Sequence, residues 1–231
     1  MKLAITQPYL FPYLGYFQLI QAVDKLVVYD DVQFTRRGWI NRNVILFNGN
    51  PHRFTMPVNS HRLPICEISL PDLTYWKRKF FTTIDFAYGK APFFVQVKSL
   101  IVEVFSSPTQ RLIDILMDSL HMVCDYLDIH TPFVMAIQYY DNRQMKKETR
   151  ILDICRDEGA DIYINLPGGK DLYNNDFFAL HKIKLHFLEY QVTPYFQKSK
   201  KFTPFLSVLD VMMFNDPAKI KNEMLYDYKL A

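Results

Sequence analysis

The first 29 residues contain a strand, a helix and a second strand in close succession, and this feature constrains the fold more than any other. Residues 2–6 form a short apolar strand segment, and residues 14–22 carry apolar side chains at the three- and four-residue spacing of a helix. Residues 25–29 are apolar and β-branched, which is typical of a buried strand. Such a unit joins two parallel strands through a crossover that is right-handed by default. The opening of the chain therefore indicates an α/β protein.

The remainder of the chain continues the alternation of strands and helices. Strands are predicted over 41–47 and 53–58, joined by the hairpin signal Asn48-Gly49-Asn50, with others over 65–70, 133–139, 161–165 and 184–190. Helices are predicted over 73–88, 92–105, 148–158 and 175–181, and two more from the Ser-Pro and Thr-Pro pairs at 107–108 and 203–204. We expect one α/β domain over 1–231, with an open, largely parallel sheet flanked by helices and a β-hairpin insertion near 41–58.

Composition excludes several classes of protein. The chain has 231 residues, of which 49% are hydrophobic and 22% are charged, so it can bury a sizeable core without disulfides or metals. Only seven residues are glycine, and the glycine-rich phosphate-binding motifs are absent. The net charge of +3 permits an anionic small molecule and does not call for nucleic acid.

Location and metal binding are predicted from what the sequence lacks. No apolar run approaches the roughly 18 residues of a membrane span, so we expect no transmembrane segment. The N-terminus has no signal-peptide pattern, and the three cysteines are isolated, which predicts a cytoplasmic protein. The histidines and cysteines show no ligand spacing, so we expect no metal site and no bound cofactor. The sequence does not predict an oligomeric state.

Candidate site residues follow the first two predicted strands. Ligands of open α/β sheets bind beyond the carboxyl ends of the strands, and two such ends fall within the first 43 residues. The candidate substrate-binding residues are Gln7, Tyr9, Gln33, Arg36, Arg37, Trp39, Asn41, Arg42 and Asn43, and the candidate catalytic residues are Asp30 and Asp31.

Each group of candidates has a functional and a structural interpretation. The arginines would hold phosphate or carboxylate through two parallel hydrogen bonds, and Trp39 would stack on a base or sugar ring. Otherwise this stretch is a solvated loop with Trp39 folded onto the core. Gln7 and Tyr9 would contact substrate, or satisfy backbone groups in a proline-rich turn. Asp30 and Asp31 would supply a general base, or form a helix cap or an ion pair with Arg36 or Arg37.

Several of these segments resemble a known protein family. The opening Gln7-Pro-Tyr-Leu-Phe-Pro-Tyr-Leu-Gly-Tyr-Phe17 is specific, and later segments agree nearly to the end of the chain; they include Tyr29–Phe34, Trp39–Asn43, Tyr88–Pro92, Pro167–Gly169 and Tyr195–Gln197. Together they resemble the WbqC-like protein family. One position departs from the expected pattern, since Phe80 stands where a His would follow the basic residues after Trp76.

The resemblance implies a role in bacterial surface-polysaccharide synthesis, such as that of the O-antigen of lipopolysaccharide. The implied activity is that of a transferase that moves an acyl or aminoacyl group to a nucleotide-linked amino sugar. The donor would be a thioester, carried by CoA or by an acyl carrier protein, and the protein would supply a base and oxyanion donors. Two alternatives stay open: a nucleotide-sugar-binding protein without catalysis, and an enzyme like the nucleotidyltransferases.

Overall fold

The computed structural model describes residues 1–231, apart from the side chain of residue 171. Its main sheet has six strands in the order β5-β2-β1-β6-β7-β8. The strands are β1 (Lys2–Thr6), β2 (Lys25–Val28), β5 (Phe133–Met135), β6 (Ile162–Asn165), β7 (Lys184–Tyr190) and β8 (Tyr228–Leu230). The first five run parallel, and β8 pairs antiparallel with β7 at one edge. The predicted α/β fold with a largely parallel sheet is confirmed, and β1 and β2 are parallel neighbours.

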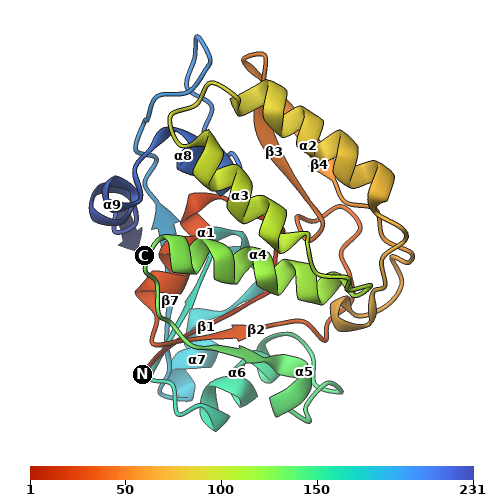
Figure 1. Cartoon of the computed structure of the whole chain (residues 1–231). Coiled ribbons are helices and arrows are strands. Elements are labelled where there is room, and N and C mark those ends of the chain that lie inside the picture. The colour runs from red at the N-terminus through yellow and green to blue at the C-terminus, as the bar shows by residue number, and fades with distance from the viewer.

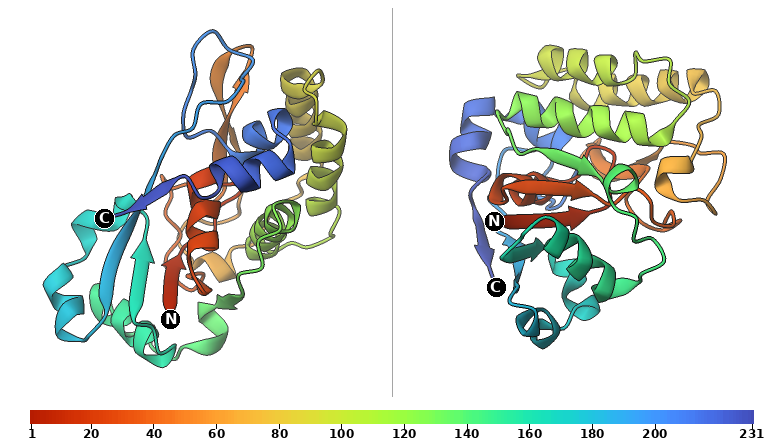
Figure 2. Two further views of the ribbon diagram at one scale, coloured as in Figure 1. Left: turned by 90° about the vertical axis from the view of Figure 1, so that its left-hand side faces the viewer. Right: turned by 90° about the horizontal axis from the view of Figure 1, so that it is seen from below.

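Helices cover both faces of this sheet (Figure 1). One face carries α1 (Leu14–Ala22), α4 (Leu112–Tyr126) and α8 (Val208–Phe214), which share a large hydrophobic cluster with α2 (Thr74–Tyr88) and α3 (Phe94–Val104). The other face packs α6 (Lys147–Asp157) and α7 (Asn175–Leu180) on a smaller cluster. Short helices lie at Ile65–Glu67 (η1), Ala136–Tyr139 (α5), Pro167–Leu172 (η2), Pro217–Lys219 (α9) and Ile220–Met224 (η3). Figure 2 shows these layers from two further sides.

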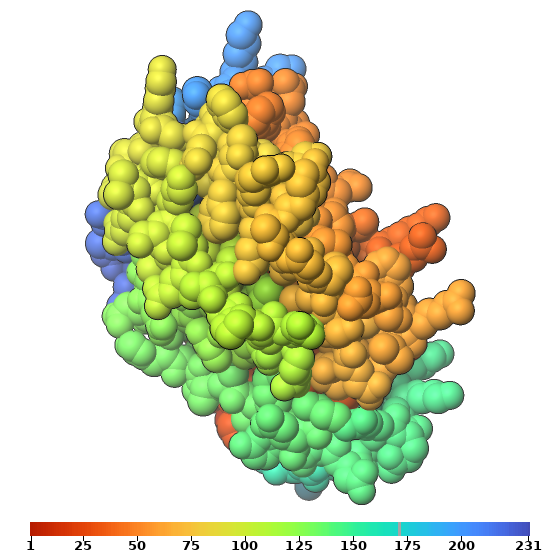
Figure 3. All heavy atoms as spheres, turned by 45° about the vertical axis from the view of Figure 1, so that its right-hand side comes forward, coloured from red at the N-terminus to blue at the C-terminus, as the bar shows by residue number. Residues whose placement is uncertain are grey.

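The hairpin near 41–58 stands apart from the main sheet. It consists of β3 (Arg42–Phe47) and β4 (Asn50–Thr55), which pair antiparallel. Asn48 and Gly49 form its turn with φ values of 50° and 74°, which asparagine and glycine tolerate better than other residues. In the space-filling view, the orange residues of the hairpin region adjoin the yellow residues of α2 (Figure 3).

Four sequence predictions of local structure are wrong. The strand predicted over 133–139 ends at Met135, because the residues that follow form the short helix α5. Residues 65–70 contain the short helix η1, because the backbone of this segment bonds instead to residues 30, 32, 110 and 112. The Ser-Pro pair at 107–108 does not begin α4, since residues 110–112 first bond to residues 68 and 70 and the helix begins only at Leu112. The Thr-Pro pair at 203–204 does not begin α8, whose cap is Ser207, because Ser207 accepts a hydrogen bond from the backbone N–H of Leu209.

The glycine at position 15 allows α1 to approach β7 closely. A Cβ atom built there would lie 2.4 Å from Cε2 of Tyr13 and 3.0 Å from Cβ of Tyr190. The Tyr13 ring could turn away, but Cβ of Tyr190 is fixed by its strand. We expect Gly15→Ala to lower the free energy of unfolding by about 1–3 kcal/mol, as overpacking does. Urea denaturation measures this change.

Gly168 offers a matched control, because a Cβ atom there would have no neighbour within 4 Å. Gly168→Ala should therefore leave stability nearly unchanged. Equal effects of the two substitutions would mean that the contact between α1 and β7 does not require glycine.

Among the described residues, none of the helices has both the length and the apolar character needed to cross a membrane.

Candidate functional site

The proline-rich loop after β1 is held in place by buried side chains from distant parts of the chain. Nδ2 of Asn43 donates to the backbone carbonyl oxygens of Leu10 and Phe11, at 3.2 and 2.6 Å. Oγ of Ser207 donates to the same Phe11 oxygen at 2.8 Å. Phe11 has a φ of 43°, an unfavourable conformation for a non-glycine residue. These bonds hold a strained loop at the carboxyl end of β1, where a ligand would bind.

An aromatic pocket lies beside this loop, with a volume of about 230 Å³. It is lined by Tyr9, Pro12, Tyr13, Trp39, Asn43 and Phe205, and this set of six residues is called the aromatic pocket below. The rings of Tyr13 and Phe205 are 5.9 Å apart in an edge-to-face arrangement, and Tyr190 packs on both. Trp39 and Phe205 are 45% and 58% exposed, so two walls of the pocket face solvent. Exposed aromatic rings beside a cavity are typical of a binding site.

Phe205 belongs to the irregular segment that links β7 to α8. The hydroxyl of Tyr195 in this segment donates to Oδ1 of Asp210 at 2.8 Å, and the hydroxyl of Tyr88 donates to Oδ2 at 2.7 Å. Oγ of Ser199 donates to the backbone oxygen of Gly49 in the hairpin turn. The segment is thus tied to α2, to α8 and to the hairpin, which together position one wall of the aromatic pocket.

One of the three arginines after β2 lies beside Trp39. The guanidinium of Arg42 lies 5.7 Å from the Trp39 ring centroid, and its Nη2 donates to the backbone oxygen of Arg37. Arg36 and Arg37 are exposed. Arg42 therefore places a positive charge beside the Trp39 wall of the aromatic pocket, which favours an anionic group next to whatever enters the pocket.

Asp30 and Asp31 lie in a second cluster, between the ends of β2 and β5. Oδ2 of Asp31 accepts from Nη2 of Arg150 at 2.5 Å and lies 3.3 Å from Nε of Arg143. Oδ1 of Asp30 accepts from the backbone N–H of Ile137 at 3.0 Å. The expected ion pair of these aspartates with Arg36 or Arg37 is not what the structure shows, because the partners of Asp31 come from the α5–α6 region.

The two aspartates differ in their surroundings. Asp31 is paired with two guanidinium groups, of which Arg150 is buried. Oδ2 of Asp30 is buried and has no hydrogen-bond partner among the described residues. Burial raises the pKa of Asp30, and the negative charge of Asp31 adds to the rise. Such a difference between neighbouring carboxyl groups makes Asp30 the better proton acceptor of the two.

The sequence candidates thus fall into three sets. Tyr9, Trp39 and Asn43 meet in the aromatic pocket, Arg42 lies beside its Trp39 wall, and Arg36 and Arg37 are exposed in the loop before it. Asp30 and Asp31 meet in the second cluster. The others make structural contacts: the Gln7 backbone oxygen accepts from the Tyr16 hydroxyl, Gln33 donates to His61, and Asn41 donates to Met56.

Sequence reasoning missed three residues of these sites. Phe205 lies far along the sequence from the first two strands, so the rule about strand ends does not point to it. Arg143 and Arg150 follow the third parallel strand, β5, and the rule about strand ends points to their region once β5 is recognised.

Comparison with known proteins agrees with the motifs found along nearly the whole chain. The family model described as "WbqC-like protein family" matches residues 7–222. The chain belongs to this family. The uncharacterized protein Rv1507c of Mycobacterium tuberculosis is 28% identical over 230 residues, covering 97% of this chain and 98% of that protein. No solved structure matches the chain significantly.

The position where the family resemblance suggested a histidine lies in the core of this chain. Phe80 is 4% exposed and stacks on Trp76 with the ring centroids 5.0 Å apart. Its ring also packs against Phe54 and Phe105. Position 80 in this chain therefore belongs to an aromatic cluster between the hairpin, α2 and α3.

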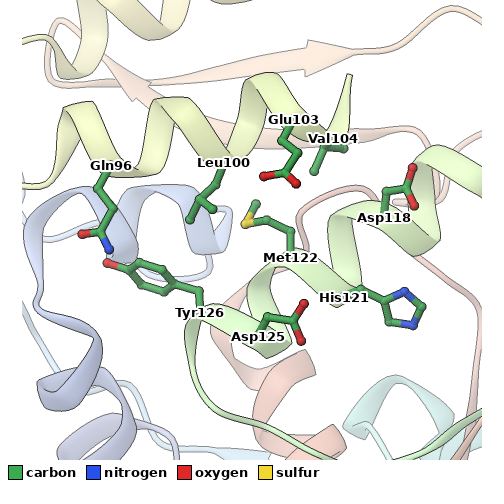
Figure 4. Close-up of a pocket in the computed structure, with 9 residues that line it drawn as sticks. All are labelled: Gln96, Leu100, Glu103, Val104, Asp118, His121, Met122, Asp125 and Tyr126. Carbon is green, nitrogen blue, oxygen red and sulfur yellow. The ribbon is translucent and has the colours of Figure 1, made fainter. Parts of the chain in front are cut away.

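A larger groove, of about 530 Å³, lies between α3 and α4 (Figure 4). Its lining includes the carboxylates of Glu103, Asp118 and Asp125, above a floor that includes Leu100 and Met122. An anionic substrate would be repelled by these carboxylates. The smaller aromatic pocket, at a strand end and with Arg42 beside it, is the better candidate for the site.

Proposed function

We propose that the chain transfers an acyl or aminoacyl group to the amino group of a nucleotide-linked amino sugar for bacterial surface-polysaccharide synthesis. The observation that carries the proposal is the aromatic pocket at the carboxyl end of β1, with Arg42 beside its Trp39 wall. The pocket would take an apolar or flat part of a reactant, and Arg36, Arg37 and Arg42 would attract its phosphates. Membership of the WbqC-like family supports the same proposal through the resemblance described above.

The proposed reaction needs a base and a hydrogen-bond donor from the protein. The sugar ammonium loses a proton to a carboxylate, and the amine nitrogen then attacks the thioester carbonyl carbon. A C–N bond forms, the C–S bond breaks, and the thiolate leaves and takes up a proton. Asp30 is the proposed base, and the Tyr9 hydroxyl is the proposed donor to the developing oxyanion. Burial raises the pKa of Tyr9, which keeps its hydroxyl protonated at neutral pH.

A binding protein without catalysis is the second candidate function. One observation favours it: Asp30 and Asp31 are buried, and neither lines the aromatic pocket. A protein that only bound a nucleotide sugar would use the pocket and the arginines in the same way, and would need no base.

Asp30→Asn tests which of the two functions is present. Asn keeps the oxygen that accepts from the Ile137 N–H and cannot accept a proton from the substrate. We expect turnover of a UDP- or dTDP-amino sugar with acetyl-CoA to fall by about 10²–10⁴-fold, while nucleotide-sugar affinity changes less than twofold. Mass spectrometry of the product and calorimetric titration give the two values.

Asp125→Asn is the matched control, because Asp125 is an exposed carboxylate in the α3–α4 groove. It should leave both values unchanged. Binding of the nucleotide sugar without turnover by the unaltered protein, over a range of thioester donors, would instead establish the binding function.

A further inference from the structure

We propose that the aromatic pocket is the acyl subsite: it holds the apolar end of the acyl group of a thioester donor, while the nucleotide sugar lies outside it. This inference rests on the proposed transfer reaction, and it assigns one reactant to one cavity. Three properties of the aromatic pocket support this inference. They are its volume, the few polar groups in its lining that are free to form hydrogen bonds, and the positive charge of Arg42 beside it.

The pocket is too small for a whole nucleotide sugar. Its volume of about 230 Å³ is below the roughly 300–1,000 Å³ of cavities that enclose drug-sized ligands. A nucleotide-linked sugar carries a base, a ribose, a diphosphate and a hexose, and is larger than such ligands. The aromatic pocket therefore receives one part of a reactant.

The polar atoms of the pocket are poorly suited to a sugar ring. The amide of Asn43 is engaged on both sides, since its Nδ2 donates to Leu10 and Phe11 and its Oδ1 accepts from the backbone N–H of Val44. Apart from Asn43, the lining side chains carry only two phenol hydroxyls and one indole N–H as polar groups. A hexose has several hydroxyls, each of which loses hydrogen bonds to water on burial and needs a partner. A hydrocarbon chain has no such requirement and gains free energy with each buried methylene.

The surroundings of the pocket fit the rest of a thioester. Burial raises the pKa of Tyr13 to about 12, so this side chain stays a neutral hydroxyl and can donate to a carbonyl oxygen. Arg42, beside Trp39, then faces the part of the donor that carries phosphate, either the nucleotide of CoA or the phosphopantetheine of a carrier protein. Both donors contain an acyl thioester and, further along the same molecule, a phosphate.

Trp39 provides a direct readout, because it lines the pocket and is 45% exposed, whereas Trp76, the other tryptophan, is stacked on Phe80. The experiment titrates Trp39 fluorescence with CoA, with acetyl-, butyryl- and hexanoyl-CoA, with hexanoyl-pantetheine and hexanoyl-phosphopantetheine, and with UMP. We expect affinity to rise about fourfold for each added methylene until the pocket is full. Tighter binding of hexanoyl-CoA than of hexanoyl-phosphopantetheine would identify CoA as the donor, and equal binding of these two, both tighter than hexanoyl-pantetheine, would indicate a carrier protein.

Phe205→Ala should weaken the binding of hexanoyl-CoA at least tenfold. It should also reduce the dependence of affinity on acyl chain length, and calorimetry measures both changes. Phe196→Ala is the matched control, because Phe196 is 72% exposed in the same segment and does not line the pocket. Affinity that is independent of chain length, equal binding of CoA and hexanoyl-CoA, or competition of UMP with hexanoyl-pantetheine, which has no nucleotide or phosphate, would overturn the acyl assignment. These binding results do not depend on turnover, so failure of the transfer reaction would be seen separately in the Asp30→Asn experiment.

Discussion

Replacing Arg150 by methionine should lower the free energy of unfolding by about 3–5 kcal/mol, the cost of leaving a buried carboxylate without its partner. The side chains of Asp31 and Arg150 are 0% and 3% exposed, and their charged groups are 2.5 Å apart. Nε of Arg150 also donates to Oδ1 of Asn142 at 2.8 Å, and its guanidinium lies 4.7 Å from the Tyr29 ring centroid. Arg150 thus connects the start of α6 to the end of β2. Chemical denaturation at pH 7 measures the loss.

Arg143 offers a matched comparison, because it approaches the same Oδ2 atom of Asp31, at 3.3 Å, but is 45% exposed. Solvent screens such a contact, so Arg143→Met should cost only about 0–1 kcal/mol. Asp31→Asn combined with Arg150→Met should recover much of the lost stability, since no unpaired charge is then buried. If the two arginine substitutions lowered the free energy of unfolding equally, burial of Arg150 would not strengthen its ion pair with Asp31.

The sequence predicted the fold well where local signals agree with tertiary structure. Leu14–Ala22 and Lys25–Val28 have strong hydrophobic patterns, and the Asn48-Gly49 turn allows few conformations, so these elements appear as expected. The Ser-Pro pair at 107–108 is equally good as a local helix start, but the segment that follows it bonds to residues 68–70. A pairing between segments 40 residues apart leaves no local signal, and this explains the error.

Part of the candidate site could also be predicted from the sequence, because some of its residues follow a general rule about strand ends. Tyr9, Trp39 and Asn43 follow neighbouring strands, so the rule about strand ends places them at one edge of the sheet. The partners of the aspartates were not predicted, because Arg150 is 119 positions from Asp31 and only the packing of α6 brings it there. The rule says which edge of the sheet is used. It does not say which charged side chains at that edge pair with one another.

Substitution of Asp210 by alanine should cost about 2–4 kcal/mol and loosen the aromatic pocket. Asp210 is fully buried and accepts hydrogen bonds from the hydroxyls of Tyr88 and Tyr195. Alanine would leave two hydroxyls without an acceptor, at about 1–3 kcal/mol for a fully buried group. The segment that carries Phe205 would also lose its tie to α8. Thermal and chemical denaturation measure the first effect, and weaker binding of hexanoyl-CoA, by calorimetry, reports the second.

The pH dependence of stability tests the electrostatic state of Asp210 separately. Burial raises its pKa in the folded state, although the hydrogen bonds from Tyr88 and Tyr195 oppose the rise. The folded state therefore holds the proton more tightly than the unfolded state, whose pKa is near the ordinary value of about 3.8. It follows that the contribution of Asp210 to stability is greatest at low pH and declines as the pH rises from there through the raised folded pKa. Asp210→Asn removes this titration, so the stability of the unaltered protein minus that of Asp210→Asn should fall as the pH rises above about 4, the ordinary pKa of the group. A difference that grows with pH would mean that the two tyrosine hydroxyls stabilise the carboxylate more than burial destabilises it.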